Sequence, residues 1–267
     1  MIRRASIPHT PVVIAVSVLS LLAVTACTGT PDVSVGAGAT SASTARGGDV
    51  LTVLAAASLT DVFEQIATDF EADHDGVDVQ FSFAASSAIV AQVNEGAPAD
   101  VIALAGQGSL EPLEREHRKS EPVVFTTNSL QIAVPPDNPA NISDLADLVG
   151  TDLILVVCEK EVPCGSAAQK LWEKNSLTPT IASYEKDVRA TLTKVELGEA
   201  DAGLVYRTDI TEAGSRVLGI EIPAEQNVIN SYPILTVSEA ALAQAFVEEV
   251  LSERGQAHLG DAGFVSP

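Results

Sequence analysis

Four short segments combine small or hydroxyl-bearing residues with the expected start of a helix that follows a strand-like run. Their one-letter sequences are AAASLTD at 55–61, FAASS at 83–87, VPCGS at 162–166 and DVR at 187–189. The first backbone N–H groups of a helix are unpaired and carry a partial positive charge, so they bind anions without a cationic side chain. Small residues let the backbone approach a ligand closely, and serine adds a hydroxyl donor. Together the four segments predict a site for an oxyanion.

Each residue taken alone also has a plainer interpretation. Ser58 and Ser86 are typical helix caps, and Ser58 has the capping-box spacing to Asp61. Tyr206, in the segment GLVY at 203–206, is typical of a core tyrosine whose hydroxyl has found a partner. The anion site therefore depends on the four segments meeting in space.

Enzyme chemistry finds little support in the sequence. The motifs G-x-S-x-G, P-loop, G-x-G-x-x-G after a strand and H-E-x-x-H are all missing. The four histidines are scattered, and three cysteines are too few for a zinc module. We predict no enzyme activity, no cofactor and no metal held by side chains. The remaining enzyme alternative is an extracytoplasmic hydrolase with Ser58 as nucleophile, although no base is visible for that serine.

The charge balance excludes two classes of partner. Asp and Glu number 36 against 15 Lys and Arg, which gives a formal net charge of -21. Nucleic acids and anionic membrane surfaces both require clustered cations, so neither is an expected electrostatic partner. With 46% hydrophobic and 19% charged residues, the chain can bury a globular core.

The N-terminus has the features of an export signal. Arg3 and Arg4 precede an apolar run over 12–26, which is shorter than the roughly 20 residues of a membrane-spanning helix. The run closes on VTAC at 24–27, which resembles the lipobox of bacterial lipoproteins and implies lipidation of Cys27. Ordinary cleavage with an incidental Cys27 thiol is the alternative. The arginine pair hints at twin-arginine export, but the residues around it match that pattern poorly.

Residues 27–48 consist mainly of Ser, Thr, Gly and Ala and cannot bury enough surface to offset their ordering entropy. We therefore predict a signal peptide over 1–26 and a flexible tether over 27–48. The folded domain then begins near Asp49 and is exported and anchored to the outer face of the cell membrane by lipid alone.

From Asp49 onward, strand-like runs alternate with amphipathic helical windows. This pattern predicts an α/β fold with a mostly parallel sheet. Prolines at 135, 136, 139 and 233 flank strand-like runs where the chain could cross into a second lobe and return. We predict lobe one over 49–127 plus 234–267 and lobe two over 128–233. The expected strands are 51–56, 77–83, 101–105, 130–134, 153–157, 202–206, 217–222 and 233–237, and the expected helices include 86–94 and 239–258.

The four segments that begin helices, at 55–61, 83–87, 162–166 and 187–189, resemble those of the molybdate-binding proteins of bacterial ABC importers, a branch of the type II periplasmic binding proteins. Further matches to the family are GAPADV at 96–101, NSL at 128–130 and GLVY at 203–206 with Asp209. They occur in the family's order and cover nearly all of 49–267. The resemblance implies two lobes joined by a hinge, each a mixed, mostly parallel sheet flanked by helices, with the oxyanion in the cleft between them.

The resemblance also implies a ligand set. Hydroxyl ligands are expected at Ser58 and Ser86, main-chain N–H donors at Cys164 and Val188, and a phenol donor at Tyr206. Residues 57, 87 and 187 would lie beside the ligand. The family often has alanine where this chain has Cys164, a change that leaves the backbone donor in place.

The function implied is a monomeric lipoprotein that binds molybdate, and tungstate as well, and delivers it to ABC transporter permease subunits. Sulfate or phosphate is the alternative ligand within the same class.

Cys158 and Cys164 are separated by five residues in a domain expected to be exported. An oxidising compartment and an even pair favour a disulfide between them, with two reduced thiols as the alternative. Redox catalysis is disfavoured because the spacing differs from C-x-x-C.

Overall fold

The computed structural model describes residues 49–150 and 152–267. The predicted signal peptide over 1–26, the tether over 27–48 and the proposed lipidation site Cys27 all lie outside the described residues. Among the helices that are described, none combines the length and apolar character needed to cross a membrane.

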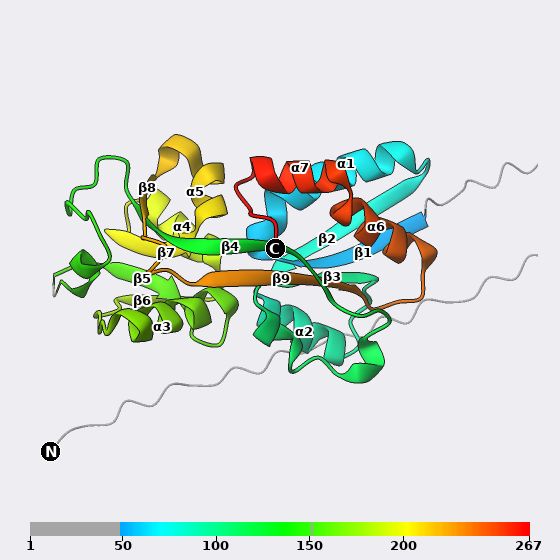
Figure 1. Ribbon diagram of the computed structural model, residues 1–267, viewed down its shortest axis with the longest axis horizontal. Coiled ribbons are helices and arrows are strands. Elements are labelled where there is room, and N and C mark those ends of the chain that lie inside the picture. Colours follow the sequence, from blue (N-terminus) through cyan, green and yellow to red (C-terminus); the bar gives the residue numbers. More distant parts are fainter. Residues whose placement is uncertain (1–48, 151) are drawn as a thin grey trace, which may run out of the picture. The chain divides into compact units, whose positions relative to one another are not determined.

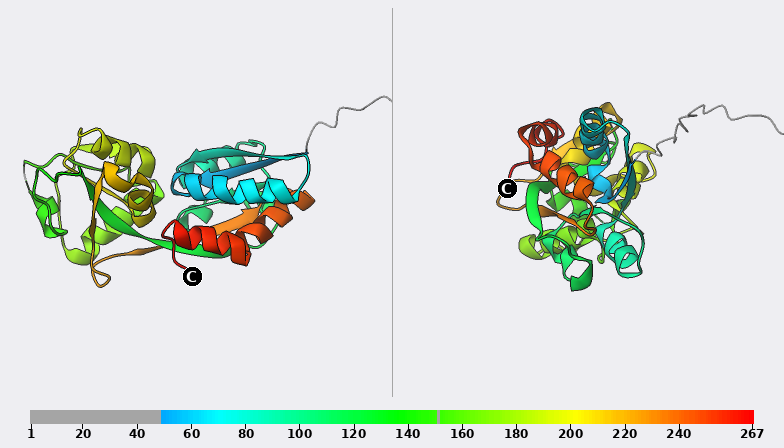
Figure 2. Two further views of the ribbon diagram at one scale, coloured as in Figure 1. Left: turned by 90° about the horizontal axis from the view of Figure 1, so that it is seen from above. Right: turned by 90° about the vertical axis from the view of Figure 1, so that its right-hand side faces the viewer.

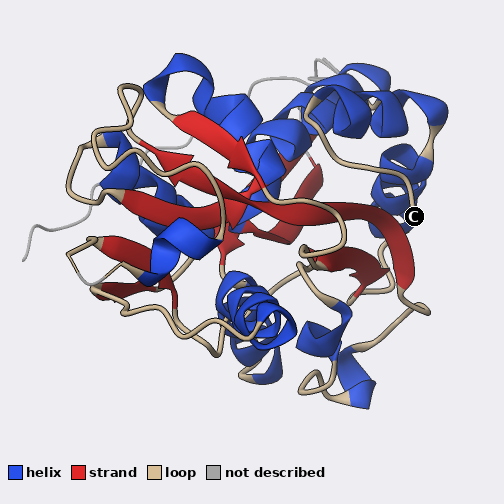
Figure 3. Ribbon diagram, turned by 60° about the vertical axis from the view of Figure 1, so that its left-hand side comes forward, coloured by secondary structure: helices blue, strands red, loops and turns tan. Residues whose placement is uncertain are grey.

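One mixed sheet organises the described chain (Figure 3). Its strands follow the order β2-β1-β3-β9-β4-β7-β5-β6, and β8 pairs with β4 beside this path. The strands are β1 (Asp49–Ala56), β2 (Val77–Ala84), β3 (Val101–Ala103), β4 (Val123–Val134), β5 (Leu155–Cys158), β6 (Ser183–Glu185), β7 (Ala202–Tyr206), β8 (Leu218–Glu221) and β9 (Ile229–Thr236).

Helices pack on this sheet, as the alternating pattern predicted. The helices are α1 (Thr60–Asp73), α2 (Ser86–Asn94), α3 (Pro163–Asn175), α4 (Val188–Glu196), α5 (Arg207–Ala213), α6 (Ala241–Leu251) and α7 (Glu253–Asp261). Short 3-10 turns are η1 (Ala57–Leu59), η2 (Gln107–Leu110), η3 (Arg115–His117), η4 (Ala146–Val149) and η5 (Gly214–Arg216). The predicted mixed α/β class is confirmed.

The parallel and antiparallel pairs follow a simple rule. Strands β1 and β2, β1 and β3, β5 and β6, and β5 and β7 pair in parallel. Every antiparallel pair among the described strands involves β4 or β9. These two strands pair with each other and run from one group of elements to the other (Figures 1 and 2). They are therefore the connections between the regions that we call lobe one and lobe two.

Lobe one has an aromatic core beneath α1. Phe63, Ile66 and Phe70 are fully buried, and their spacing places them on one face of the helix. The Phe246 ring of α6 lies 6.0 Å from that of Phe63 and 5.4 Å from that of Phe70. The periodicity of α1 thus fixes which face of the helix meets the sheet.

Lobe two has an aliphatic core between its strands and α3 and α4. Leu155, Leu171, Leu192 and Leu204 are members of one buried cluster. Ala57, which belongs to lobe one, packs into the same cluster. The lobes therefore touch directly at the turn that carries Ser58.

Several boundaries differ from the sequence-based expectation. Strands β4 and β9 begin earlier than expected, so both predicted lobe boundaries fall inside these strands. The helix expected over 239–258 is broken at Ser252, whose extended backbone separates α6 from α7 and whose hydroxyl accepts from the Gly255 N–H at 3.1 Å. Strand β6 was not anticipated, because its three residues are too few to show a periodicity.

A disulfide joins Cys158 at the end of β5 to Cys164 at the start of α3. It closes the loop between them, and Gly165 follows directly. A Cβ atom on Gly165 would lie 1.9 Å from the Glu159 carbonyl oxygen. The loop and the first turn of α3 therefore approach each other at a distance that only glycine permits.

Replacing Gly165 with alanine should destabilise the protein by about 1–3 kcal/mol, because the clash is with backbone that the disulfide restrains. Thermal unfolding of Gly165→Ala against the parent protein measures the effect. Gly260→Ala is the matched control, since its added Cβ meets nothing within 4 Å. An unchanged melting temperature for Gly165→Ala would contradict the predicted close approach.

Candidate functional site

A small cavity between the lobes collects most of the predicted ligand residues. Its volume is about 20 Å³. Ser58, Ser86, Cys164 and Tyr206 all line it. The complete lining is residues 56–58, 84–86 and 105 from lobe one and residues 163, 164, 187 and 206 from lobe two.

Val188, the fifth predicted ligand, is the first residue of α4 and directly follows the lining residue Asp187. Ser87, predicted to lie beside the ligand, instead lines a neighbouring pocket of about 390 Å³ between the lobes. The structure therefore brings four predicted ligands to one cavity and places the fifth at its edge.

Two helices present unpaired N–H groups at this cavity. Cys164 follows Pro163 in the first turn of α3, and Val188 opens α4. Neither backbone N–H donates to an acceptor in the part of the chain that the structure describes. Proline at the first helical position has no N–H of its own, so the next amide is the first donor. Both helix starts can therefore donate to an anion.

Ser86 is arranged as a hydroxyl donor. It is fully buried at the start of α2, and its Oγ accepts from the Ala105 N–H at 2.8 Å. Because that bond uses an oxygen lone pair, the hydroxyl proton remains free to donate. The helix cap considered for this residue is not formed, since no side chain caps α2.

Ser58 lies in the turn η1, before α1. Its hydroxyl is hydrogen-bonded to that of Tyr232 at 2.9 Å, and no side chain caps η1 or α1. The capping box of Ser58 with Asp61 is therefore absent. The hydroxyl is instead hydrogen-bonded to a residue of β9.

Tyr206 ends β7 and is also held from β9. Its hydroxyl oxygen accepts from the Asn230 side-chain amide at 2.7 Å. Burial raises the pKa of both the Tyr206 and the Tyr232 phenol. Both groups therefore remain protonated and can act as donors.

Asn230 and Tyr232 are functional candidates that sequence reasoning missed. Neither belongs to a motif, and both lie on a strand expected to begin only at Pro233. The spacing of two residues between them, which places both on one face of a strand, would have been the only available signal.

Asp187 is the one carboxylate among the residues that line the cavity. Its Oδ1 accepts from the Ala190 N–H at 2.8 Å, so it is the N-cap of α4. The cap fixes the first turn of α4 and thereby the direction of the Val188 amide.

A charged group lies behind the cavity wall. Asp209 is fully buried, its Oδ2 accepts from the Tyr206 N–H at 2.8 Å, and its Oδ1 lies 3.4 Å from Nε of Arg189. Burial raises the pKa of Asp209 to about 6, although the Arg189 charge and the Tyr206 N–H act in the opposite direction. Asp209 was noted only as part of the family pattern, and no role was predicted for it.

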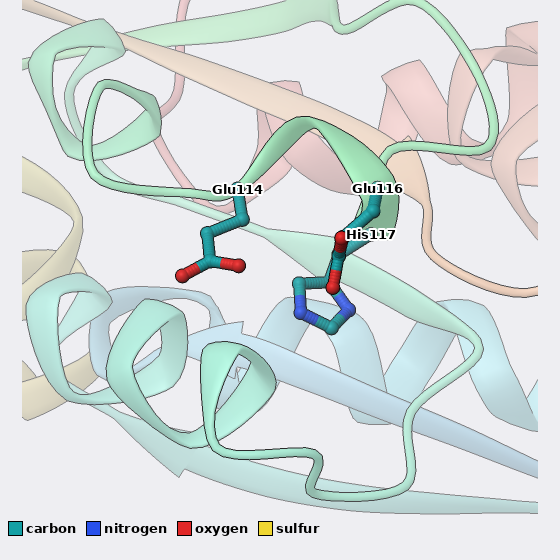
Figure 4. A group of neighbouring side chains, drawn as sticks. All are labelled: Glu114, Glu116 and His117. Atoms are coloured by element: carbon teal, nitrogen blue, oxygen red, sulfur yellow. The ribbon is translucent and has the colours of Figure 1, made fainter.

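Two other features lie outside the cavity. Glu114, Glu116 and His117 form the one cluster of potential metal ligands found among the described residues (Figure 4). The two glutamates are exposed, and such acidic groups are common without an ion. A larger groove of about 480 Å³ lies in lobe two beside Trp172 and the disulfide, and none of the five predicted ligands lines it.

Residues 51–265 match the family model described as bacterial extracellular solute-binding protein. The chain belongs to this family. The family is extracellular and comprises proteins that bind solutes, in keeping with the predicted absence of enzyme activity.

Individual relatives narrow the comparison. The chain is 36% identical over 226 residues to the molybdate-binding protein ModA of Mycobacterium tuberculosis, covering 83% of this chain and 87% of that protein. It matches the solved periplasmic molybdate-binding protein of Azotobacter vinelandii with a TM-score of 0.71 and 20% identity, over 81% of this chain and 99% of the other. The sulfate-binding protein SubI of M. tuberculosis matches with a TM-score of 0.70 and 20% identity, over 81% and 86%. The two structural matches show the fold of this solute-binding protein, a type II periplasmic binding fold, and the sequence match shows that it is similar to ModA.

Asp209 predicts a specific pH dependence. Because its pKa is raised in the folded state, the proton is held more tightly there than in the unfolded chain. The resulting stability is fully present below the unfolded pKa near 4 and is lost as the pH rises through about 6. Two pKa units correspond to roughly 3 kcal/mol.

Urea unfolding of the parent protein and of Asp209→Asn between pH 4 and pH 7 measures this contribution. The free energy of unfolding of the parent should fall relative to that of the variant by about 3 kcal/mol across this range. A difference between the two proteins that stays constant with pH would contradict the raised pKa.

Proposed function

We propose that this protein binds molybdate, and tungstate as well, and delivers it to the permease subunits of an ABC transporter. The observation that carries the proposal is the meeting of hydroxyl and backbone N–H donors from both lobes at one cavity. The ligands are Ser58, Ser86, the amides of Cys164 and Val188, and Tyr206. The close sequence relative named for molybdate binding supports the choice of anion.

Such a site needs no cation. Each hydrogen bond to a charged group contributes about 1.5–3 kcal/mol, so five donors can offset the desolvation of a dianion. The net charge of -21 does not oppose this, because diffuse surface charge is largely screened beyond roughly 8–10 Å. Only the donors in contact with the anion determine the binding energy.

The cavity volume gives this proposal a mechanical consequence. A cavity of about 20 Å³ has room for one water-sized group. A tetrahedral oxyanion carries four oxygens and needs more room, so the side chains around the cavity must shift to accommodate it while the lobes stay together. Ser58 and Tyr206 would then turn their hydroxyl protons toward the anion while Tyr232 and Asn230 stay in contact with their oxygens.

Export and anchoring complete the proposal. The protein would act as a monomer at the outer face of the cell membrane, attached through lipid on Cys27. The support for this comes from the segment VTAC at 24–27 and from the extracellular character of the family.

Molybdate should raise the melting temperature by about 8–16 °C at a thousandfold excess over Kd. A ligand that binds only the folded state contributes about 4.1 kcal/mol at that excess, and each kcal/mol shifts Tm by roughly 2–4 °C. Tungstate should behave similarly, with sulfate and phosphate much weaker. Elemental analysis of the purified protein provides an independent measurement. A larger shift with sulfate or phosphate would assign the site to that anion instead.

Ser58→Ala, Ser86→Ala and Tyr206→Phe should each shrink the molybdate shift, because each removes a donor and leaves a ligand oxygen unpaired. Ser252→Ala is the control, because it removes the cap of α7. It should lower the free energy of unfolding by about 1 kcal/mol, and with it the ligand-free Tm, and leave the molybdate shift unchanged. Unchanged shifts in all three site variants would show that the ligand set is wrong.

Lipidation can be tested directly on the membrane fraction. Mass spectrometry of the mature N-terminus should find Cys27 as the first residue and carrying lipid. An unmodified Cys27, or a mature N-terminus elsewhere, would disprove the anchor.

A further inference from the structure

Arg189 reaches from one lobe to the other. It is the second residue of α4 in lobe two, directly after Val188. Its guanidinium forms an ion pair with the carboxylate of Asp61 on α1, and its Nε lies 3.4 Å from the carbonyl oxygen of Ala57. Both partners belong to lobe one.

This pair differs from the other ion pairs of the described residues. All of the others join groups within a single lobe, such as Lys194 with Glu185 in lobe two and Arg254 with Asp73 in lobe one. The Arg189 and Asp61 side chains are 27% and 34% exposed, so their pairing is partly shielded from solvent. Among the described ion pairs, this one alone would break if the lobes separated.

Both ends of the pair belong to segments that carry proposed ligands. The Ala57 carbonyl and Asp61 lie on either side of Ser58, and Arg189 follows the Val188 amide. Arg189 therefore connects the ligand-bearing turn of lobe one to the first turn of α4. Arg189 contacts protein groups, so it would affect anion binding by holding these two segments together.

Asp209 holds the arginine on the side of lobe two. Its buried Oδ1 lies 3.4 Å from Nε of Arg189, and its Oδ2 accepts from the N–H of Tyr206. A charged side chain fixed at its base loses less conformational freedom when it meets its partner. Arg189 is thus oriented within lobe two by the same residue that holds the Tyr206 backbone.

We infer that Arg189 is a positioning residue that latches the two lobes over the bound anion through its ion pair with Asp61. This inference rests on the proposed function. The latch would slow release of the anion, since the lobes must part for it to leave and the pair must then break. It would have little effect on capture, which begins with the lobes apart.

The test measures release of radiolabelled molybdate from the purified full-length protein into excess unlabelled molybdate. Asp61→Asn and Arg189→Gln should each release the anion on the order of tenfold faster, with the association rate nearly unchanged, and the Kd should rise by the same factor. The double variant should release the anion no faster than the faster-releasing single variant, because both substitutions remove the same interaction.

Glu185→Gln is the matched control. It removes the ion pair of Lys194, which is on α4 like Arg189, but this pair stays within lobe two. Its release rate should equal that of the parent protein. Asp61→Asn keeps the test decisive if Arg189→Gln, which leaves the buried Asp209 unpaired, does not fold.

The outcomes separate the latch from a purely structural pair. If Asp61→Asn lowers the ligand-free melting temperature and leaves molybdate release unchanged, the pair is structural and the latch is disproved. Additive effects in the double variant would equally disprove it. A parent protein that binds no oxyanion would overturn the proposed function, and the latch with it.

Discussion

The first backbone N–H groups of a helix have no acceptor within that helix, and α2, α3 and α4 all begin at the same small cavity. This concentration of donors would be costly without a partner, because buried polar groups are normally hydrogen-bonded. Most other features of the site serve these helix starts. Pro163 and the Asp187 cap fix the first turns of α3 and α4. The small side chains of the alanines at 56, 57, 84, 85 and 105 leave the backbone around the cavity accessible to a ligand.

The strands that join the lobes are also part of the site. Asn230 and Tyr232 lie on β9 and hold the hydroxyls of Tyr206 and Ser58 from behind. Ser58 belongs to lobe one and Tyr206 to lobe two, so one connecting strand contacts proposed ligand residues in both lobes. In the proposed complex, the anion and β9 would share the hydroxyl groups of Ser58 and Tyr206.

Charge is used sparingly near the cavity. The donors that face it are neutral, and the one carboxylate in the lining, that of Asp187, is the N-cap of α4. The charged side chains of Arg189, Asp61 and Asp209 are not part of the lining. Neutral donors bind an anion without placing an unpaired cation in the site when it leaves. The charged side chains can then act between the lobes, and the raised pKa of Asp209 reflects the cost of placing one carboxylate in the interior.

Local patterns in the sequence predicted most of the elements, although not β6 or the break at Ser252, and they led to the proposed list of donors. The strand-like run over 77–83 indicated β2, the helical window over 86–94 indicated α2, and the helix starts indicated an oxyanion site, because each of these signals extends over a few neighbouring residues. The tertiary structure decided what meets across the chain: Tyr232 with Ser58, Arg189 with Asp61, and the full extents of β4 and β9. These contacts join positions separated by more than a hundred residues, or depend on which strands become neighbours. No periodicity of a single segment records that information, since it arises only when the two lobes pack together.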